Sequence, residues 1–178
     1  MIEQQKHSLQ YIKANSVCAE VGVWEGELSS FILKRQPAKL HLIDPWQTQD
    51  VIDRLYSINQ EKMDRVYENV SNRFGKLSNV EIHREFSTNV SFPIEYFDWV
   101  YIDADHSYDA VKKDLEFYYP LMKKGAYLCG DDYGLWHPKP KTGAGSDAGG
   151  GPKPAVDEFV SKYNLKLKVF KDQFVIFL

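Results

Sequence analysis

The sequence predicts an α/β fold, a doubly wound sheet of seven strands that is mostly parallel and ends in a C-terminal antiparallel hairpin. Short apolar runs rich in β-branched and aromatic residues alternate with longer stretches of helical period, which is typical of a sheet with helices on its faces. The last two apolar runs follow each other directly, which predicts the hairpin. A length of 178 residues suits about one globular domain, so we expect a single domain over 1–178.

The elements are expected in the following order. Five strands come first, at about 16–23, 39–44, 80–86, 97–103 and 126–129, and LKLKVF and FVIFL then form the hairpin. Helices are expected at about 28–34, across 58–74, over 107–122 and at 155–163. In the third helix Val111, Leu115 and Tyr118 recur at three- and four-residue spacing. Ligands of such sheets bind beyond the carboxyl ends of the strands, so residues directly after each strand are the candidates for function.

Composition excludes several classes of protein. The chain has 22 Lys plus Arg against 25 Asp plus Glu and no long basic run, so we expect no nucleic-acid partner. Its apolar runs are far shorter than the roughly 20 residues of a membrane span, and the N-terminus lacks a signal pattern. We therefore expect a cytoplasmic protein without a membrane partner. Cys18 and Cys129 lie in apolar runs without metal-ligand spacing and are expected to be reduced core residues.

A glycine-bracketed turn follows the first strand in AEVGVWEGELSS. Gly22 and Gly26 bracket the turn and Ser29 opens the next helix. Glycine lets the backbone approach a ligand closely, and a helix N-terminus presents free N–H groups. Trp24 stands where the GxGxxG fingerprint has its middle glycine, which disfavours a nicotinamide or flavin cofactor. A ligand without phosphates fits this turn better.

Two acids accompany this turn. Glu20 lies in an apolar strand, where a buried carboxylate needs a partner, so we expect it to face a cationic ligand group or backbone N–H groups. The alternative is a strand-end acid near solvent. Asp44 closes the second strand about 20 positions past the turn, where an acid typically hydrogen-bonds a ribose. A capping or turn role is the alternative for Asp44.

Acidic residues also follow the fourth and fifth strands directly. They are Asp103 and Asp105, with His106, after the fourth strand, and Asp131 and Asp132 after the fifth. If these strands are neighbours, the carboxylates crowd together, which raises their pKa values unless a cation is present. A hard cation such as Mg²⁺ prefers such oxygen ligands. The alternative is that the acids cap helices and turns, as Ser107 is expected to do.

The other histidines have no such setting and are expected to be surface or strand residues: His7, His41, His83 and His137.

With these residues, the sequence resembles the class I S-adenosylmethionine-dependent methyltransferases, and more narrowly their metal-dependent O-methyltransferase branch, which includes sugar O-methyltransferases. The resemblance covers nearly the whole chain. Its carriers are ExGxxxGxxS at 20–29, Asp44, IDADHSYDAVKKDL, GDDY and GPKPAVDEF. It implies a Rossmann-like fold, S-adenosylmethionine as cofactor, and a hydroxylated small molecule as substrate.

The resemblance also implies roles for individual residues. Glu20 and the backbone at Gly22 would serve the amino-acid part of the cofactor, Asp44 its ribose, and the region around Phe86 and Ser87 its adenine. The full implied set of cofactor-binding residues is Glu20, Gly22, Gly26, Asp44, Phe86, Ser87 and Asp103. The implied ligands of Mg²⁺, or of another hard divalent cation, are Asp103, Asp131 and Asp132.

We hypothesise a metal-assisted methyl transfer, in which the cation binds a substrate hydroxyl, lowers its pKa and holds the oxygen in line with the sulfonium methyl. Asp105 is the first candidate for the catalytic base, because two residues beyond Asp103 on an extended strand end it would point the same way. His106 is the second, because its ordinary pKa suits work near neutrality.

Two other functions stay open. One is a metal-dependent hydrolase or hydroxylase-like enzyme that uses the same acids on the same fold. The other is a non-catalytic binding protein in which Trp24 spoils the cofactor turn.

The long 134–154 segment is expected to be a lid, with a flexible loop as the alternative. Lysines 139, 141 and 153 could attract an anionic substrate, although scattered lysines usually serve solvation. A homo-oligomer is also open: Tyr118, Tyr119 and Trp136 are candidates for a dimer interface, with core or pocket packing as the alternative.

Overall fold

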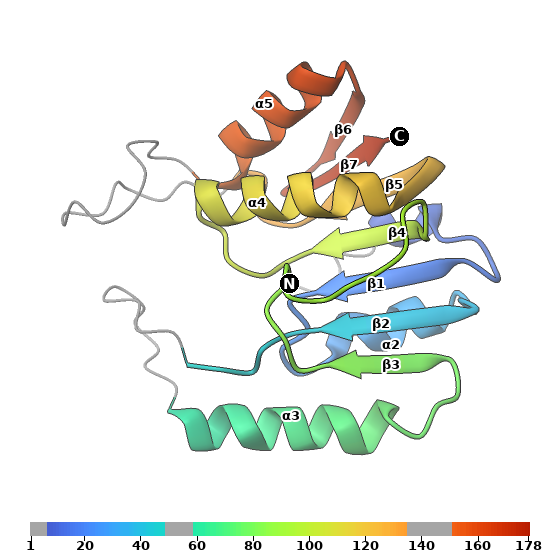
Figure 1. Ribbon diagram of the computed structural model, residues 1–178, viewed down its shortest axis with the longest axis vertical. Helices are drawn as coiled ribbons and strands as arrows, with labels where there is room; N and C mark the ends of the chain where they lie inside the picture. The colour runs from blue at the N-terminus through green and yellow to red at the C-terminus, as the bar shows by residue number, and fades with distance from the viewer. Residues whose placement is uncertain (1–6, 49–58, 135–150) are drawn as a thin grey trace.

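A computed structural model describes residues 7–48, 59–134 and 151–178. Within these residues the strands form a seven-stranded sheet in the order β3-β2-β1-β4-β5-β7-β6. The first five strands are parallel, and β7 runs antiparallel to both β5 and β6. The predicted fold class is confirmed, including the C-terminal hairpin (Figure 1).

The strands are β1 (Val17–Val21), β2 (Lys39–Ile43), β3 (Val80–His83), β4 (Phe97–Ile102), β5 (Met122–Gly130), β6 (Lys166–Phe170) and β7 (Gln173–Phe177). The helices are α2 (Glu27–Leu33), α3 (Gln60–Phe74), α4 (Tyr108–Tyr118) and α5 (Pro152–Tyr163), with short 3₁₀ segments η1 (Ser8–Tyr11) and η2 (Tyr119–Leu121).

Several element boundaries differ from the expectation, and three of them have a clear physical reason. The helix expected to reach residue 122 ends at Tyr118, because Pro120 lacks an N–H and cannot continue it. The strand after it begins at Met122, where it pairs with Phe97 of β4. Strand β3 ends at His83 rather than at residue 86, because its partner β2 ends opposite, at Ile43.

Two layers of helices cover the sheet. Figure 1 shows α4 in front of the sheet and α2 behind it. On the α4 side, Val111 of α4 and Phe159 of α5 pack with Val100 of β4 in one buried cluster. On the other side, helices α2 and α3 pack against β1, β2 and β4. Cys18 and Cys129 are free and fully buried, as expected.

Residues 84–96 connect β3 to β4 without a helix. Phe92 and Tyr96 stack on each other, with ring centroids 5.8 Å apart, and the N–H of Tyr96 donates to the carbonyl of Leu121 at 2.7 Å. This connection, rather than a helix, lies against β2 and β3 on the α4 side. None of the described helices is long and apolar enough to cross a membrane.

Candidate functional site

A cavity of about 340 Å³ opens at the carboxyl ends of the parallel strands. It lies beside the point where the strand order reverses, between β1 and β4, which is where such sheets bind ligands. Its walls come from the ends of β1, β2 and β4, from the turn after β3, and from α4. Four residues predicted from the sequence line it together: Gly22, Phe86, Ser87 and Asp105.

The two glycines of the first turn are required by packing. Gly22 has a φ of +88°, and a Cβ there would lie 2.1 Å from the carbonyl oxygen of Asp103. Gly26 has a φ of +71°, and its Cβ would lie 2.6 Å from the ring of Phe74. Any side chain at residue 22 would therefore force the ends of β1 and β4 apart and deform the cavity wall.

Asp44 holds this turn through main-chain hydrogen bonds. Its Oδ2 accepts from the N–H groups of Val23 at 2.9 Å and Trp24 at 3.0 Å, and its Oδ1 accepts from Trp46 at 2.7 Å. The Trp46 indole returns a bond to the carbonyl of Trp24 at 3.0 Å. Asp44 thus has the turn role that was the alternative expectation, and its neighbours Ile43 and Pro45 line the cavity.

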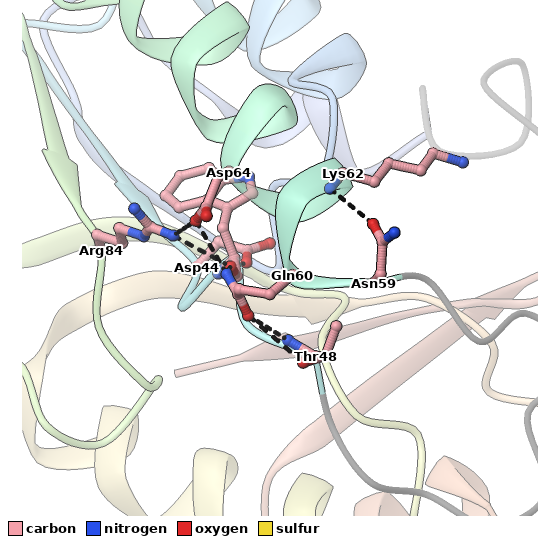
Figure 2. Close-up of polar contacts among 8 residues, drawn as sticks. Asp44, Thr48, Asn59, Gln60, Lys62, Asp64 and Arg84 are labelled. Atoms are coloured by element: carbon pink, nitrogen blue, oxygen red, sulfur yellow. Dashed lines mark hydrogen bonds and ion pairs between the residues drawn. The ribbon is translucent and has the colours of Figure 1, made fainter.

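A side-chain network ties the segment after β2 to the start of α3, and sequence reasoning missed it. Gln60 donates to the carbonyl of Trp46 at 2.9 Å and accepts from the N–H of Thr48 at 3.1 Å. Figure 2 shows Gln60 between Thr48 and Asp64, with Arg84 paired to Asp64. Arg84 lies two residues before Phe86, which lines the cavity, so this network anchors the start of the segment that forms that wall.

Glu20 lies beneath the turn and is only 2% exposed. It accepts a hydrogen bond of 2.5 Å from the hydroxyl of Ser29. Burial raises the pKa of Glu20 well above its usual range, and the neighbouring Asp103 and Asp44 carboxylates add to the rise. A cation placed beside Glu20 would stabilise its ionised form, which burial and the neighbouring carboxylates disfavour.

His106 lies between two of the predicted metal ligands. Its Nε2 is 3.1 Å from Oδ1 of Asp103, and its Nδ1 is 3.2 Å from Oδ2 of Asp132. Burial raises the pKa of Asp103, although its bond to His106 opposes the rise. Burial acts to lower the pKa of His106, but the bond to Asp103 and the nearby carboxylate charges outweigh it and raise that pKa. This favours an imidazolium held between two carboxylates.

The third predicted metal ligand, Asp131, is buried at the end of β5, with its N–H bonded to the carbonyl of Ile102 at 3.2 Å. The neighbouring strands β4 and β5 thus bring Asp103, Asp131 and Asp132 to one edge of the sheet. Among the described residues, these three do not form a group whose ligand atoms all lie within 4.8 Å of one another.

Asp105 and Asp103 do not share the expected orientation. Strand β4 ends at Ile102, so the strand alternation does not extend to them. Asp105 accepts a 2.8 Å bond from the N–H of Ser107, while Asp103 contacts His106. Ser107 caps α4 as predicted, by accepting from the N–H of Ala110 at 3.4 Å.

Asp114 is a cavity residue that sequence reasoning missed. It lies on the buried side of α4, is 3% exposed, and accepts a 2.5 Å bond from the Ser87 hydroxyl. Burial raises the pKa of Asp114 to about 6, although the Ser87 bond opposes this. The signal in the sequence was an acid three residues after Val111, within the apolar stripe of an amphipathic helix.

The remaining predicted residues either pack against other aromatic or main-chain groups, form an ion pair, or lie outside the described residues. Tyr118 is fully buried and donates to the carbonyl of Ser87 at 2.8 Å, so it has the core role that was the alternative to a dimer interface. Tyr119 is half-buried and packs against Tyr163. Lys153 pairs with Asp157 at 2.5 Å. Trp136, His137, Lys139, Lys141 and most of the predicted lid lie outside the described residues.

Comparison with known families gives two matches. A model described as "Methyltransferase domain" matches residues 19–133, and one described as "Rhamnosyl O-methyltransferase/CmcI" matches 94–175. An uncharacterized protein, R132 of Acanthamoeba polyphaga mimivirus, is 30% identical over 138 residues, which is 72% of this chain and 53% of that protein. The chain thus spans about half the length of this curated relative.

Solved structures share the fold. The O-methyltransferase NovP superposes with a TM-score of 0.66 at 20% identity, over 99% of this chain and 78% of that chain. A protein of Corynebacterium glutamicum gives 0.63 at 15% identity, over 99% and 80% of the two chains. A SAM-dependent methyltransferase of Aquifex aeolicus gives 0.55 at 19% identity, over 98% and 88%.

Proposed function

This chain belongs to the methyltransferase domain family, and we propose that it transfers the methyl group of S-adenosylmethionine to a hydroxyl oxygen of a small molecule such as a sugar. One observation carries the proposal: a cavity at the strand-order reversal touches the glycine turn on one side and Asp105, next to the acidic cluster, on the other. The match of residues 94–175 to a rhamnosyl O-methyltransferase model supports a sugar-like acceptor.

The cofactor fits the charges and surfaces of this cavity. S-adenosylmethionine carries a sulfonium and an amino group. Glu20 directly precedes the cavity residues Val21 and Gly22, and a cation bound there would offset the burial and carboxylate repulsion that raise the pKa of Glu20. Phe86 lines the cavity yet is 43% exposed, so its ring is available to cover an adenine. Asp44, between the cavity residues Ile43 and Pro45, remains the candidate to hold the ribose.

The donor set at the other side fits a hard divalent cation. Asp103, Asp131 and Asp132 are carboxylates, the ligands that Mg²⁺ prefers, and they would hold it. When bound, the cation supplies Lewis acidity that lowers the pKa of the acceptor hydroxyl. Asp105 lines the cavity and is the candidate to take the hydroxyl proton on a carboxylate oxygen. His106, held between Asp103 and Asp132, positions these carboxylates. To act as the second candidate base, it would first have to lose a proton from the imidazolium that they favour.

Calorimetric titration of the metal-stripped protein tests this function. We expect binding of S-adenosylmethionine and then of Mg²⁺, with Mg²⁺ binding lost in the triple variant Asp103→Ala, Asp131→Ala, Asp132→Ala. The matched control is Asp109→Asn, an exposed acid in the first turn of α4. Metal binding without cofactor binding would instead favour the hydrolase-like alternative, and binding of neither would favour a non-catalytic protein.

Turnover then identifies the base. With sugar and catechol-like acceptors, the pH–rate profiles of Asp105→Asn and His106→Ala are compared with that of the wild type. We expect the Asp105→Asn profile to lose the limb on which the wild-type rate rises with pH, because that limb reports deprotonation of the base. Full activity in both variants would exclude both residues.

A further inference from the structure

Two histidines and a glutamate gather on β2 and β3, away from the cavity chemistry. His41 of β2 lies opposite Glu81 of β3, and His83 follows two residues later on the same side of β3. On this side of the sheet the neighbours of His41 are the rings of Phe92, Tyr96 and Phe97, not a helix. The cluster therefore lies between the sheet and the 84–96 connection.

The three side chains aim their ligand atoms at one another. His41 Nδ1 lies 2.9 Å from His83 Nε2 and 4.0 Å from Glu81 Oε2, and His83 Nε2 lies 3.8 Å from Glu81 Oε1. All three ligand atoms lie within 4.8 Å of one another. Ligands of a tetrahedral ion with bonds of about 2.05 Å stand about 3.3 Å apart. The two distances to Glu81 end on different oxygens of its carboxylate. With one oxygen as the ligand, each side of the triangle is at most 4.8 Å and must change by no more than about 1.5 Å to match that spacing.

The Nε2 atom of His41, which faces away from His83, already has the hydrogen-bond acceptor that a metal-binding imidazole needs for its other nitrogen. Its Nε2 lies 3.1 Å from the hydroxyl of Tyr96, so it can donate a hydrogen there and leave Nδ1 free. The bond between the two rings means that one facing nitrogen carries a hydrogen. If that hydrogen is moved to Nδ1 of His83, both facing nitrogens become lone-pair donors and neither ring changes its charge.

We propose that His41, Glu81 and His83 form a binding site for a divalent cation of borderline softness, with Zn²⁺ the best match to two imidazoles and one carboxylate. Three protein ligands leave a fourth position for water. The site is separate from the carboxylate cluster of Asp103, Asp131 and Asp132, which is proposed to hold Mg²⁺. It does not depend on the proposed methyl transfer. Its role is structural: it ties β2 to β3 and, through Tyr96, to the connection that covers them.

Lys39 sets the strength of this site. Its Nζ pairs with Glu81 Oε2 at 3.0 Å, so the ammonium neutralises the carboxylate that the cation would use. For a cation to bind the Glu81 carboxylate, the Lys39 ammonium must move away from it, because the two positive charges compete for one carboxylate. Removing the charge at residue 39 should therefore tighten cation binding, which a merely structural ion pair would not predict.

Competition for Zn²⁺ with a chromophoric chelator tests the proposal on the full, EDTA-treated chain. We expect one tight site in the wild type, an affinity at least about a hundredfold weaker in His83→Gln, and a loss of about tenfold in Tyr96→Phe. Lys39→Gln should bind several-fold more tightly. His106→Gln, which removes the histidine of the carboxylate cluster, is the matched control and should bind as the wild type does.

Glu81→Gln keeps the test independent of folding, because the Glu81 side chain is 50% exposed and its loss leaves the core intact. It should also weaken Zn²⁺ binding, with an unchanged circular dichroism spectrum. Wild-type affinity in both His83→Gln and Glu81→Gln overturns the proposal, as does loss of the tight site in His106→Gln. Failure of methyl transfer with normal Zn²⁺ binding would affect only the proposed function.

Discussion

Two halves of the carboxyl edge differ in what holds them. In the turn half, residues 20–26 with Asp44, the contacts run through the main chain: Asp44 accepts three N–H groups, and the Asp103 carbonyl lies where a side chain on Gly22 would be. In the acidic half, Asp103 and Asp132 are joined through the His106 ring. The turn half is therefore fixed by main-chain contacts, whereas the acidic half is held by side-chain charges, which the proposed cation would rearrange.

The largest effect should come from breaking the turn half. Gly22→Ala places a Cβ 2.1 Å from a main-chain oxygen, which cannot move without parting β1 from β4. We expect a loss of more than about 4 kcal/mol in the free energy of unfolding, measured by urea denaturation. Gly125→Ala is the control, because Gly125 also has a positive φ but open space around it, so it should lose only about 1–2 kcal/mol. Equal losses would contradict the steric argument.

Breaking the acidic half should stop chemistry and spare the fold. If the proposed function is right, Asp103→Asn lowers kcat by about a thousandfold, equivalent to about 4 kcal/mol of barrier. Affinity for S-adenosylmethionine should change far less, because the turn half stays in place. Steady-state kinetics with saturating Mg²⁺ and calorimetry separate the two quantities. A larger effect on cofactor affinity than on kcat would remove the distinction between the halves.

Asp114 sharpens the comparison through pH. Its folded pKa of about 6 is above the ordinary 3.8, so the protonated form favours the folded state. Stability from this group is full below about pH 4 and is lost as pH rises through 6, by up to about 3 kcal/mol. Asp114→Asn should remove this dependence in urea denaturation between pH 4 and 7. Asp109→Asn should keep it; a pH dependence unchanged in Asp114→Asn would refute the assignment.

The smallest expected effect lies within the turn half. Glu20→Gln keeps the shape of the side chain and its contact with Ser29, but it removes a carboxyl that can ionise when a cationic cofactor binds beside it. We expect the affinity for S-adenosylmethionine to fall about tenfold, or about 1.4 kcal/mol, by calorimetry. S-adenosylhomocysteine, which lacks the sulfonium charge, should lose less. An equal loss for both ligands would place the effect in packing or in the shared amino group rather than at the sulfonium.

The sequence predicted what depends on neighbours along the chain. Apolar runs located the strands, and the turn residues from Glu20 to Ser29 fell within one short segment. The start of β5 escaped because Lys123, Lys124 and Gly125 carry no apolar signal, although the backbone of this strand begins pairing at Met122.

What the sequence could not predict depends on register and on distant partners. Asp114 meets Ser87 across 27 residues, and His41 meets His83 across 42. The strand pairing that sets His41 opposite Glu81 decides that these side chains share a face, and a single chain shows no such pairing in its pattern. The histidines therefore seemed to be ordinary strand residues.

The helix-free connection over residues 84–96 joins the cavity to the histidine cluster on β2 and β3. Phe86 and Ser87 in this segment line the cavity, and Tyr96 at its far end touches His41. If the proposed cation site and the cofactor cavity are both occupied, each ligand restrains one end of this segment, and the two occupancies are linked to the extent that the segment transmits the restraint. Such linkage is reciprocal: whatever factor Zn²⁺ contributes to the retention of cofactor, the cofactor must contribute to the retention of Zn²⁺.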